Sequence, residues 1–194
     1  STGANTAFSA TGGGTVSVTG SANTLSTTSG TALNVANTTI GASGLTFQSI
    51  FSNTAASGIV LNNTGSNGGL TVTGIGGDGT GGSIQNSTGP GVSLTSTGSV
   101  SLTSMTISDG LDDGIRGSSV TGLTIANSTV SNNGNAVTER GVEVTNLLGT
   151  ASITGSTITS SAEDNLYILN DVATALNLTV SGGTISETDA VTGG

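Results

Sequence analysis

Residues 122–134 read GLTIANSTVSNNG, and this stretch decides the fold class. Leu123 and Ile125 alternate with polar residues, a period of two that places both side chains on one face of a short β-strand. The Asn-Ser pair that follows is typical of a turn, and Val130 is then the single apolar residue of a second short strand. Asn and Gly end the stretch, as they do in tight turns. The pattern predicts short, half-buried strands joined by corners.

Three kinds of short strand recur in the same order along the chain. The first is a Gly or Asn followed by two apolar residues two positions apart, with copies at 58–61, 91–94, 141–144 and 165–168. The second has the form of the LTI segment above, with copies at 16–18, 45–47, 70–72, 100–102, 123–125, 151–153 and 176–178. The third has one apolar residue, namely Leu25, Phe51, Ile84, Ile107, Val130, Ile158 and Ile185. This last series recurs every 23 to 33 residues, about 27 on average.

Three strands repeated about seven times predict an all-β fold, a three-faced parallel β-solenoid, or parallel β-helix. Equivalent strands of successive turns would stack roughly 4.8 Å apart, giving a rod of roughly 34 Å. We expect one domain over residues 1–194, with repeats over approximately 14–190, as a fragment or repeating unit of a longer assembly. Phe47 and Phe51 are expected in the core, and Gly74–Gly82 as a lengthened corner.

The composition excludes several kinds of chemistry. Gly, Thr, Ser and Asn make up about 59% of the 194 residues, and the chain has no Lys, His, Cys or Trp. Disulfides, Cys/His zinc sites, a histidine base and a lysine Schiff base are therefore impossible. The net charge of −9 disfavours nucleic acid and anionic membranes as partners. No apolar segment approaches the length of a membrane-spanning helix.

The 122–134 stretch and the Gly-Ile/Val-x-Leu units resemble the right-handed parallel β-helix repeats of bacterial secreted and cell-surface proteins. The resemblance covers roughly residues 14–190. It implies a right-handed solenoid and an extracellular or cell-surface location. Its superfamily includes polysaccharide lyases, glycoside hydrolases, phage tailspikes and adhesin passengers. The Ser, Thr, Asn and Gly content here is most similar to segments of very large bacterial surface proteins.

Alignment of the corners predicts where the charged residues lie. Asp113, Arg140 and Asp164 take equivalent positions on successive turns, and so do Arg116 and Glu143. Opposite charges on adjacent parallel strands stabilise each other by about 0.2–1 kcal/mol per pair. We therefore expect Arg140 between Asp113 and Asp164, and Arg116 stacked on Glu143. Both arginines would then have structural rather than catalytic roles.

A second ladder is predicted along the third strand. It comprises Asn53, Asn86, Asp109 and Asn132, each two residues after the apolar residue of its strand. Stacked amides can hydrogen-bond along the axis, as in cross-β structures. The structural interpretation is favoured, and a ligand groove lined by these side chains is the alternative.

The one dense acidic segment is Asp109-Gly110-Leu111-Asp112-Asp113. Paired carboxylates are required for glycosidic hydrolysis, but the His and basic residues that accompany them in β-helix hydrolases and lyases are missing here. A solvated corner is the leading interpretation. The alternative is a calcium site, with Asp109, Asp112 and Asn132 as ligands, because calcium prefers oxygen ligands. No other cofactor is expected.

Three functions remain open from the sequence. The leading hypothesis is a non-enzymatic structural or adhesive module that contacts neighbouring solenoid segments or stacks end to end into a filament, since neither end has a capping sequence. The alternative is a domain that binds or degrades polysaccharide, or surface glycans, although aromatic residues are only 2% of the chain. The third is ice binding through Thr-rich strands such as 157–159, which the unequal turn lengths disfavour.

Overall fold

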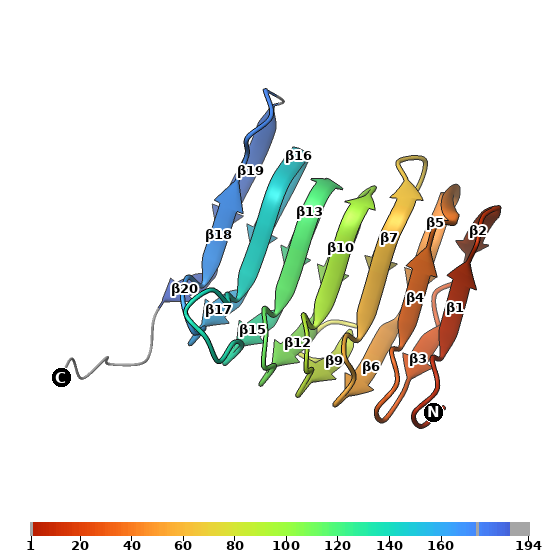
Figure 1. Cartoon of the computed structure of the whole chain (residues 1–194), viewed down its shortest axis with the longest axis horizontal. Helices are drawn as coiled ribbons and strands as arrows, with labels where there is room; N and C mark the ends of the chain where they lie inside the picture. The colour runs from red at the N-terminus through yellow and green to blue at the C-terminus, as the bar shows by residue number, and fades with distance from the viewer. Residues whose placement is uncertain (1, 174, 187–194) are drawn as a thin grey trace.

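The fold is a parallel β-solenoid of about seven turns, seen in a computed structural model that describes residues 2–173 and 175–186. Every strand pairing is parallel and joins one turn to the next, so the stacked turns line up along the long axis in Figure 1. No helix occurs among these residues. It follows that none of them forms a helix able to cross a membrane.

Each turn contributes one strand to each of three faces. Face 1 contains β1 (Phe8–Thr11), β4 (Leu33–Ala36), β7 (Ile59–Gly65), β10 (Val92–Thr97), β13 (Ile115–Thr121), the first part of β16 (Val142–Thr154) and β18 (Leu166–Leu169). Face 2 contains β2 (Thr15–Val18), β5 (Thr39–Phe47), β8 (Leu70–Val72), β11 (Val100–Thr103), β14 (Leu123–Ala126), the second part of β16 and β19 (Leu176–Ser181). Face 3 contains β3 (Thr24–Ser26), β6 (Ser49–Asn53), β9 (Gly82–Gln85), β12 (Met105–Ser108), β15 (Thr129–Ser131), β17 (Thr157–Thr159) and β20 (Thr184–Ser186).

The core consists of apolar columns that run along the axis. In one column of face 1 the paired residues of five successive turns are all fully buried, namely Leu33, Ile59, Val92, Ile115 and Val142. Burying such a side chain contributes about 1.5–3 kcal/mol, and a turn obtains this contribution only when neighbouring turns cover it. The polar residues that alternate with them face outward, as the sequence predicted.

The corners are built from residues with left-handed backbone conformation. Within residues 2–173 and 175–186, the 12 non-glycine residues with positive φ all lie in three corner columns. Corner 1, between faces 1 and 2, contains Asn37, Asn63, Ser96, Ser119 and Asn146. Corner 2, between faces 2 and 3, contains Ser104 and Asn127 beside Gly74, Gly155 and Gly182. Corner 3, between face 3 and the next turn, contains Thr54, Asn86, Asp109, Asn132 and Ser160. Asn, Asp and Gly adopt this conformation most readily, which explains much of the composition.

The prediction that Phe51 lies in the core is wrong. Leu25 pairs with Ile50 rather than with Phe51, and Ile50 is fully buried. Alternation along β6 then turns Phe51 outward, where its side chain is 39% exposed, and turns Ser52 inward. The other expected core aromatic, Phe47, is buried and packs edge-to-face on Phe8.

Differences in turn length lie in the corners and in two irregular strand pairings, where the register shifts between Val16 and Val18 on β2 and between Thr95 and Thr97 on β10. The long segment 73–81 connects β8 to β9, as expected for a lengthened corner, and the strands on either side remain in register. The first described strand, β1, begins at Phe8 and pairs with β4, and the expected limit near residue 190 lies outside the described residues. From β5 onward, the outward residues of face 2 stay in register despite the unequal turn lengths.

Candidate functional site

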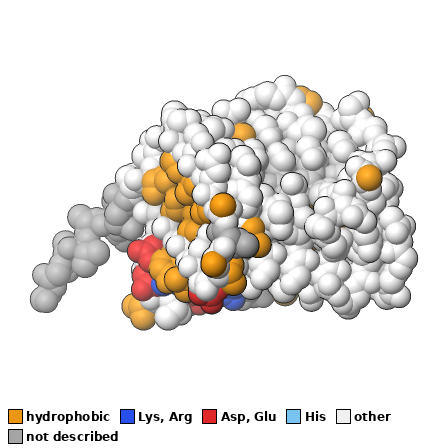
Figure 2. Space-filling model, turned by 90° about the horizontal axis from the view of Figure 1, so that it is seen from above, with side chains coloured by type: hydrophobic (Ala, Val, Ile, Leu, Met, Phe, Trp, Pro, Cys, Tyr) orange, Lys and Arg blue, Asp and Glu red, His pale blue; other side chains and the backbone are white. Residues whose placement is uncertain are grey.

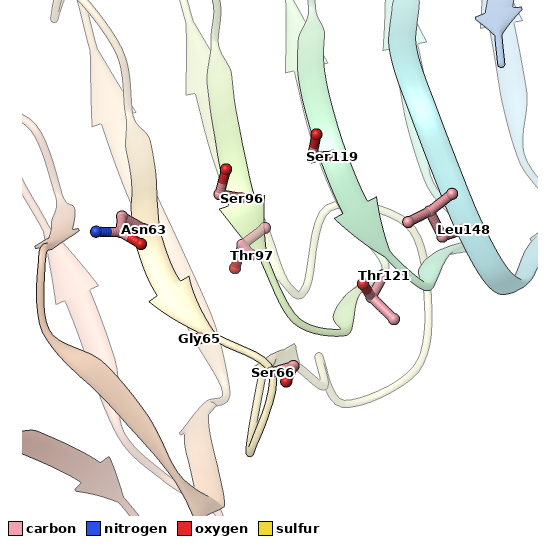
Figure 3. Close-up of a pocket in the computed structure, with 8 residues that line it drawn as sticks. All are labelled: Asn63, Gly65, Ser66, Ser96, Thr97, Ser119, Thr121 and Leu148. Carbon is pink, nitrogen blue, oxygen red and sulfur yellow. The ribbon is translucent and has the colours of Figure 1, made fainter. Parts of the chain in front are cut away.

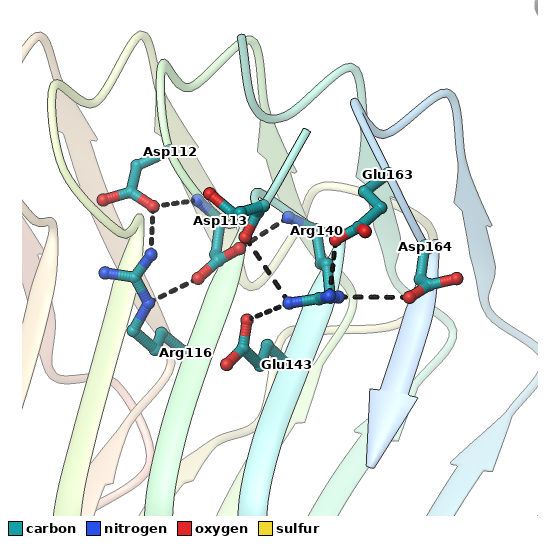
Figure 4. Close-up of polar contacts among 8 residues, drawn as sticks. Asp112, Asp113, Arg116, Arg140, Glu143, Glu163 and Asp164 are labelled. Atoms are coloured by element: carbon teal, nitrogen blue, oxygen red, sulfur yellow. Dashed lines mark hydrogen bonds and ion pairs between the residues drawn. The ribbon is translucent and has the colours of Figure 1, made fainter. Parts of the chain in front are cut away.

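Charged side chains gather at corner 3 over the later turns of the solenoid. Asp112 and Asp113 precede β13, and Arg140, Glu163 and Asp164 occupy the equivalent connections of the next two turns. We call these five residues, with Arg116 on β13 and Glu143 on β16, the charged corner (Figure 4). Five carboxylates face two guanidinium groups there. The corner is therefore acidic overall.

Arg140 joins two turns of the solenoid. Its guanidinium group pairs with Glu143 at 2.8 Å, with Asp164 at 3.1 Å and with Glu163. It also lies over the ring of Tyr167, 4.1 Å from the ring centroid. Glu143 and Tyr167 are paired neighbours on β16 and β18. Arg140 thus attaches the last described turn to the one before it.

Arg116 binds acids of its own turn. Its Nε donates to Asp113 at 2.5 Å, and it also pairs with Asp112. The predicted register holds, because Arg116 and Glu143 are ladder partners, but the side-chain partners differ from the prediction. Glu143 pairs with Arg140, and Asp113 accepts a hydrogen bond from the Arg140 backbone amide instead of its guanidinium group. The corner connection brings Asp112 and Asp113 closer to Arg116 than strand stacking alone predicts.

Burial dominates the electrostatics of Asp113. Its side chain is fully buried, and this loss of water raises its pKa above the ordinary value of 3.8, although the Arg140 amide and Arg116 act in the opposite direction. For Arg116, partial burial lowers the pKa, but Asp113 and Asp112 outweigh it and the net pKa is raised. The two partners respond differently because Arg116 remains 44% exposed. The ion pairs therefore favour the charged form of Arg116, whereas burial still disfavours the charged form of Asp113.

The predicted Asn ladder is present in two separate parts. Asn86 donates to Asn53 at 2.8 Å, and Asn132 donates to Asp109 at 2.7 Å. Within the described part of the chain, no hydrogen bond joins the Asn86 side chain to Asp109. The backbone register differs by one residue at the first turn, because Asn53 pairs with Gln85. The ladder is therefore not continuous along the corner.

The candidate calcium ligands are engaged in other contacts. Asp109 accepts hydrogen bonds from Asn132 on Oδ1 and from Ser108 on Oδ2. Asp112 Oδ1 accepts from the Asp113 amide and pairs with Arg116. Among residues 2–173 and 175–186, no three Asp or Glu side chains lie close enough together to hold a metal ion. The calcium site stays a prediction, with Asp109 and Asn132 in contact and both Asp109 and Asp112 bound by other groups of the protein.

Two of the three carboxylates in the acidic segment 109–113 are held in a similar way. Asp112 and Asp113 both bind Arg116, and Asp113 is fully buried. A glycosidase needs one acid to protonate the leaving group and a second carboxylate placed across the scissile bond. Asp112 and Asp113 share one guanidinium group, whereas Asp109, the third carboxylate, accepts hydrogen bonds from Asn132 and Ser108. The geometry favours the structural role expected for both arginines.

A groove crosses corner 1 on another side of the molecule. It has a volume of about 330 Å³ and is lined by Asn63, Gly65, Ser66, Ser96, Thr97, Ser119, Thr121 and Leu148 (Figure 3). These residues come from β7, β10, β13 and β16 and from the connection after β7, hence from four successive turns. The sequence pattern did not predict this groove. Its only sequence signal is the SNGG segment at 66–69, a connection longer than those of the next two turns.

Comparison with known protein families, with curated protein sequences and with solved structures finds no significant match.

Proposed function

We propose that the chain is a non-enzymatic structural and adhesive module of an extracellular or cell-surface assembly, and that its solenoid extends through its ends. The observation that carries this proposal is that both terminal turns have open edges. Among the residues that the structure describes, strands β1, β2 and β3 pair on one side only, and so do β18, β19 and β20. Unpaired strand edges are templates for further strands.

Exposed apolar side chains are concentrated in the last described turn. Leu169, Val172, Val180 and Ile185 are exposed by 39–48%, and all four belong to the last described turn. Figure 2 shows hydrophobic side chains gathered near this end, beside acidic and arginine side chains, whereas most of the same view is uncharged. Contiguous apolar surface of this kind favours an interaction site.

The two ends present matching columns. Phe8 in the first turn and Leu166 in the last belong to the same axial column of face 1, and Ala10 and Ile168 belong to the next one. All four side chains are only partly buried. A further solenoid turn at either end would continue these columns. A second copy of the chain or a neighbouring solenoid segment would provide that turn. Copies that stack head to tail in this way form open-ended filaments.

Substitution at the end tests the proposal. We expect Val180→Lys to lower the association constant of the purified chain by about tenfold or more, because a charge is then buried in the end contact. Val137→Lys is the matched control, since Val137 is 79% exposed in the connection before β16. Analytical ultracentrifugation over a concentration series measures both variants. Equal association of the two variants would argue against end contacts.

Ice binding is a second candidate function, and the side chains on the outer surface of face 2 favour it. Outward hydroxyls form a regular rank across face 2, with one residue per turn: Thr46, Thr71, Ser101, Thr124, Ser152 and Thr179. Successive members lie roughly 4.8 Å apart. No described strand of faces 2 and 3 carries a charged residue. Although the turn lengths differ, this rank stays in register from β5 to β19, which answers the objection from unequal turn lengths for that part of face 2.

Thermal hysteresis of freezing tests this second candidate. If face 2 binds ice, Thr124→Lys abolishes the hysteresis of the chain, because a hydrated ammonium group interrupts the rank. Thr95→Lys on β10 of face 1 is the control and leaves the hysteresis unchanged. Absence of hysteresis in the unsubstituted chain would exclude the candidate.

A further inference from the structure

The groove at corner 1 has a floor of two turns between two walls. Ser96 and Thr97 of β10 and Ser119 and Thr121 of β13 form the floor. One wall is the connection after β7, and the other contains Leu148 of β16, three turns along the axis (Figure 3). Neighbouring turns lie roughly 4.8 Å apart, so the walls are separated by roughly 14 Å.

The groove offers hydrogen-bonding groups that the protein does not use. Within the described residues, the hydroxyls of Ser66, Ser96, Ser119 and Thr121 form no hydrogen bond with the chain. Asn63 donates its amide to Asn37 at 3.1 Å, which leaves its Oδ1 free to accept. Hydroxyls both donate and accept, so the floor can bind groups of either kind.

The floor is also fixed in place. Thr97 is 3% exposed, and its hydroxyl shares a 2.6 Å hydrogen bond with the fully buried hydroxyl of Thr64. Ser96 and Ser119 have positive φ in the corner column, and the flanking residues are paired in the parallel ladder. A site on a rigid scaffold needs little ordering when it binds, so less affinity is lost.

We propose that this groove binds a short segment of an uncharged glycan. The ligand is neutral because no lining residue is charged. It is polyhydroxylated because the groove presents four free hydroxyls and an amide oxygen, while Leu148 provides an apolar contact for the C–H face of a sugar ring. No aromatic residue lines the groove, so binding rests on neutral hydrogen bonds and is weak, with Kd on the order of 1 mM. This site is independent of the end contacts proposed above.

Affinity electrophoresis tests the proposal, because a chain of net charge −9 migrates readily in a native gel. Gels contain dextran or galactomannan as neutral probes, or alginate as an anionic one. Thr121→Phe fills the groove, and Thr71→Phe is the matched control, an exposed threonine on β8 of face 2. Circular dichroism melting establishes that each variant is folded. Thr121→Val, which keeps the shape and removes the hydroxyl, provides a second test if Thr121→Phe is unfolded.

We expect at least one neutral glycan to retard the unsubstituted chain and Thr71→Phe, and alginate to retard neither. Thr121→Phe should bind that glycan at least tenfold more weakly, and Thr121→Val about threefold to tenfold more weakly, the loss expected for one neutral hydrogen bond. Three results would overturn the proposal: no retardation by either neutral glycan, retardation by alginate alone, or equal retardation of the folded groove variants and the unsubstituted chain. End-to-end association is measured separately, so failure here leaves the rod proposal untouched.

Discussion

At the residue scale, the solenoid depends on which side chains tolerate a corner and which tolerate burial. The corner columns select Asn, Asp, Ser and Gly, because positive φ is strained for most other residues. Inside the rod, a few polar groups are buried with internal partners, as at Thr64 and Thr97. Each feature repeats from turn to turn, so single substitutions can be compared with equivalent positions.

In the described part of the chain, Thr54 is the one β-branched residue with positive φ, and its φ is 60°. We predict that Thr54→Asn stabilises the fold by about 1 kcal/mol, because the strain of a β-branched side chain in this conformation is relieved. Asn86→Thr, at the equivalent position of the next turn, should destabilise by a similar amount. Urea unfolding monitored by circular dichroism measures both. Destabilisation by Thr54→Asn would contradict the assignment of strain.

The buried hydroxyl pair of Thr64 and Thr97 predicts a non-additive mutant cycle. Each single change to Val leaves the other hydroxyl buried without its partner and should cost about 1–3 kcal/mol. The double change should be close to the unsubstituted chain, since the same column continues with buried Val120 and Leu147. Chemical unfolding of all four proteins gives the coupling energy. Additive losses would show that the hydroxyls do not act as a pair.

Asp113 predicts a pH dependence of stability. Burial raises its pKa in the folded state, so the folded protein binds more protons than the unfolded one just above pH 3.8. Its contribution to the unfolding free energy should therefore fall as pH rises from about 4 through the raised folded-state value. Asp113→Asn should remove this part of the slope. A contribution from Asp113 that rises with pH over this range would contradict the burial effect.

At the element scale, the ladder register follows from the sequence, whereas the side-chain partners do not. Arg116 and Glu143 are ladder partners as the corner spacing predicted, because a slip of one residue would turn the core side chains outward. Arg116 nevertheless pairs with Asp112 and Asp113, since a corner connection has no fixed period. Phe51 was misplaced for a related reason: its strand has apolar residues at two adjacent positions, and alternation alone does not decide which one is buried.

The attachment of the last turn is predicted to depend on Arg140. Arg140→Gln should speed amide hydrogen exchange in β18 by about tenfold, because contacts to Asp164, Glu163 and Tyr167 are lost, while exchange in β10 stays unchanged. Arg116→Gln is the matched control, since Arg116 pairs with acids of its own turn. Hydrogen exchange read by mass spectrometry resolves the two strands. An equal effect of both substitutions on β18 would contradict the role of Arg140.

At the scale of the whole molecule, the sequence predicts the three faces and about seven turns, because period-two strands recur with turn residues between them. The groove at corner 1 could not be predicted in this way. It depends on how far the connection at 66–69 rises above the corners of the next two turns, and on the outward position of Leu148. Both are properties of stacked turns rather than of one repeat.

The central claim is that the solenoid extends along its own axis through its open ends. Small-angle X-ray scattering over a concentration series tests it most directly. We predict that the maximum dimension grows in steps of roughly 34 Å, the length of seven turns, while the cross-sectional radius stays constant. A maximum dimension that stays at the length of one module at every concentration, or growth that widens the cross-section, would contradict the claim.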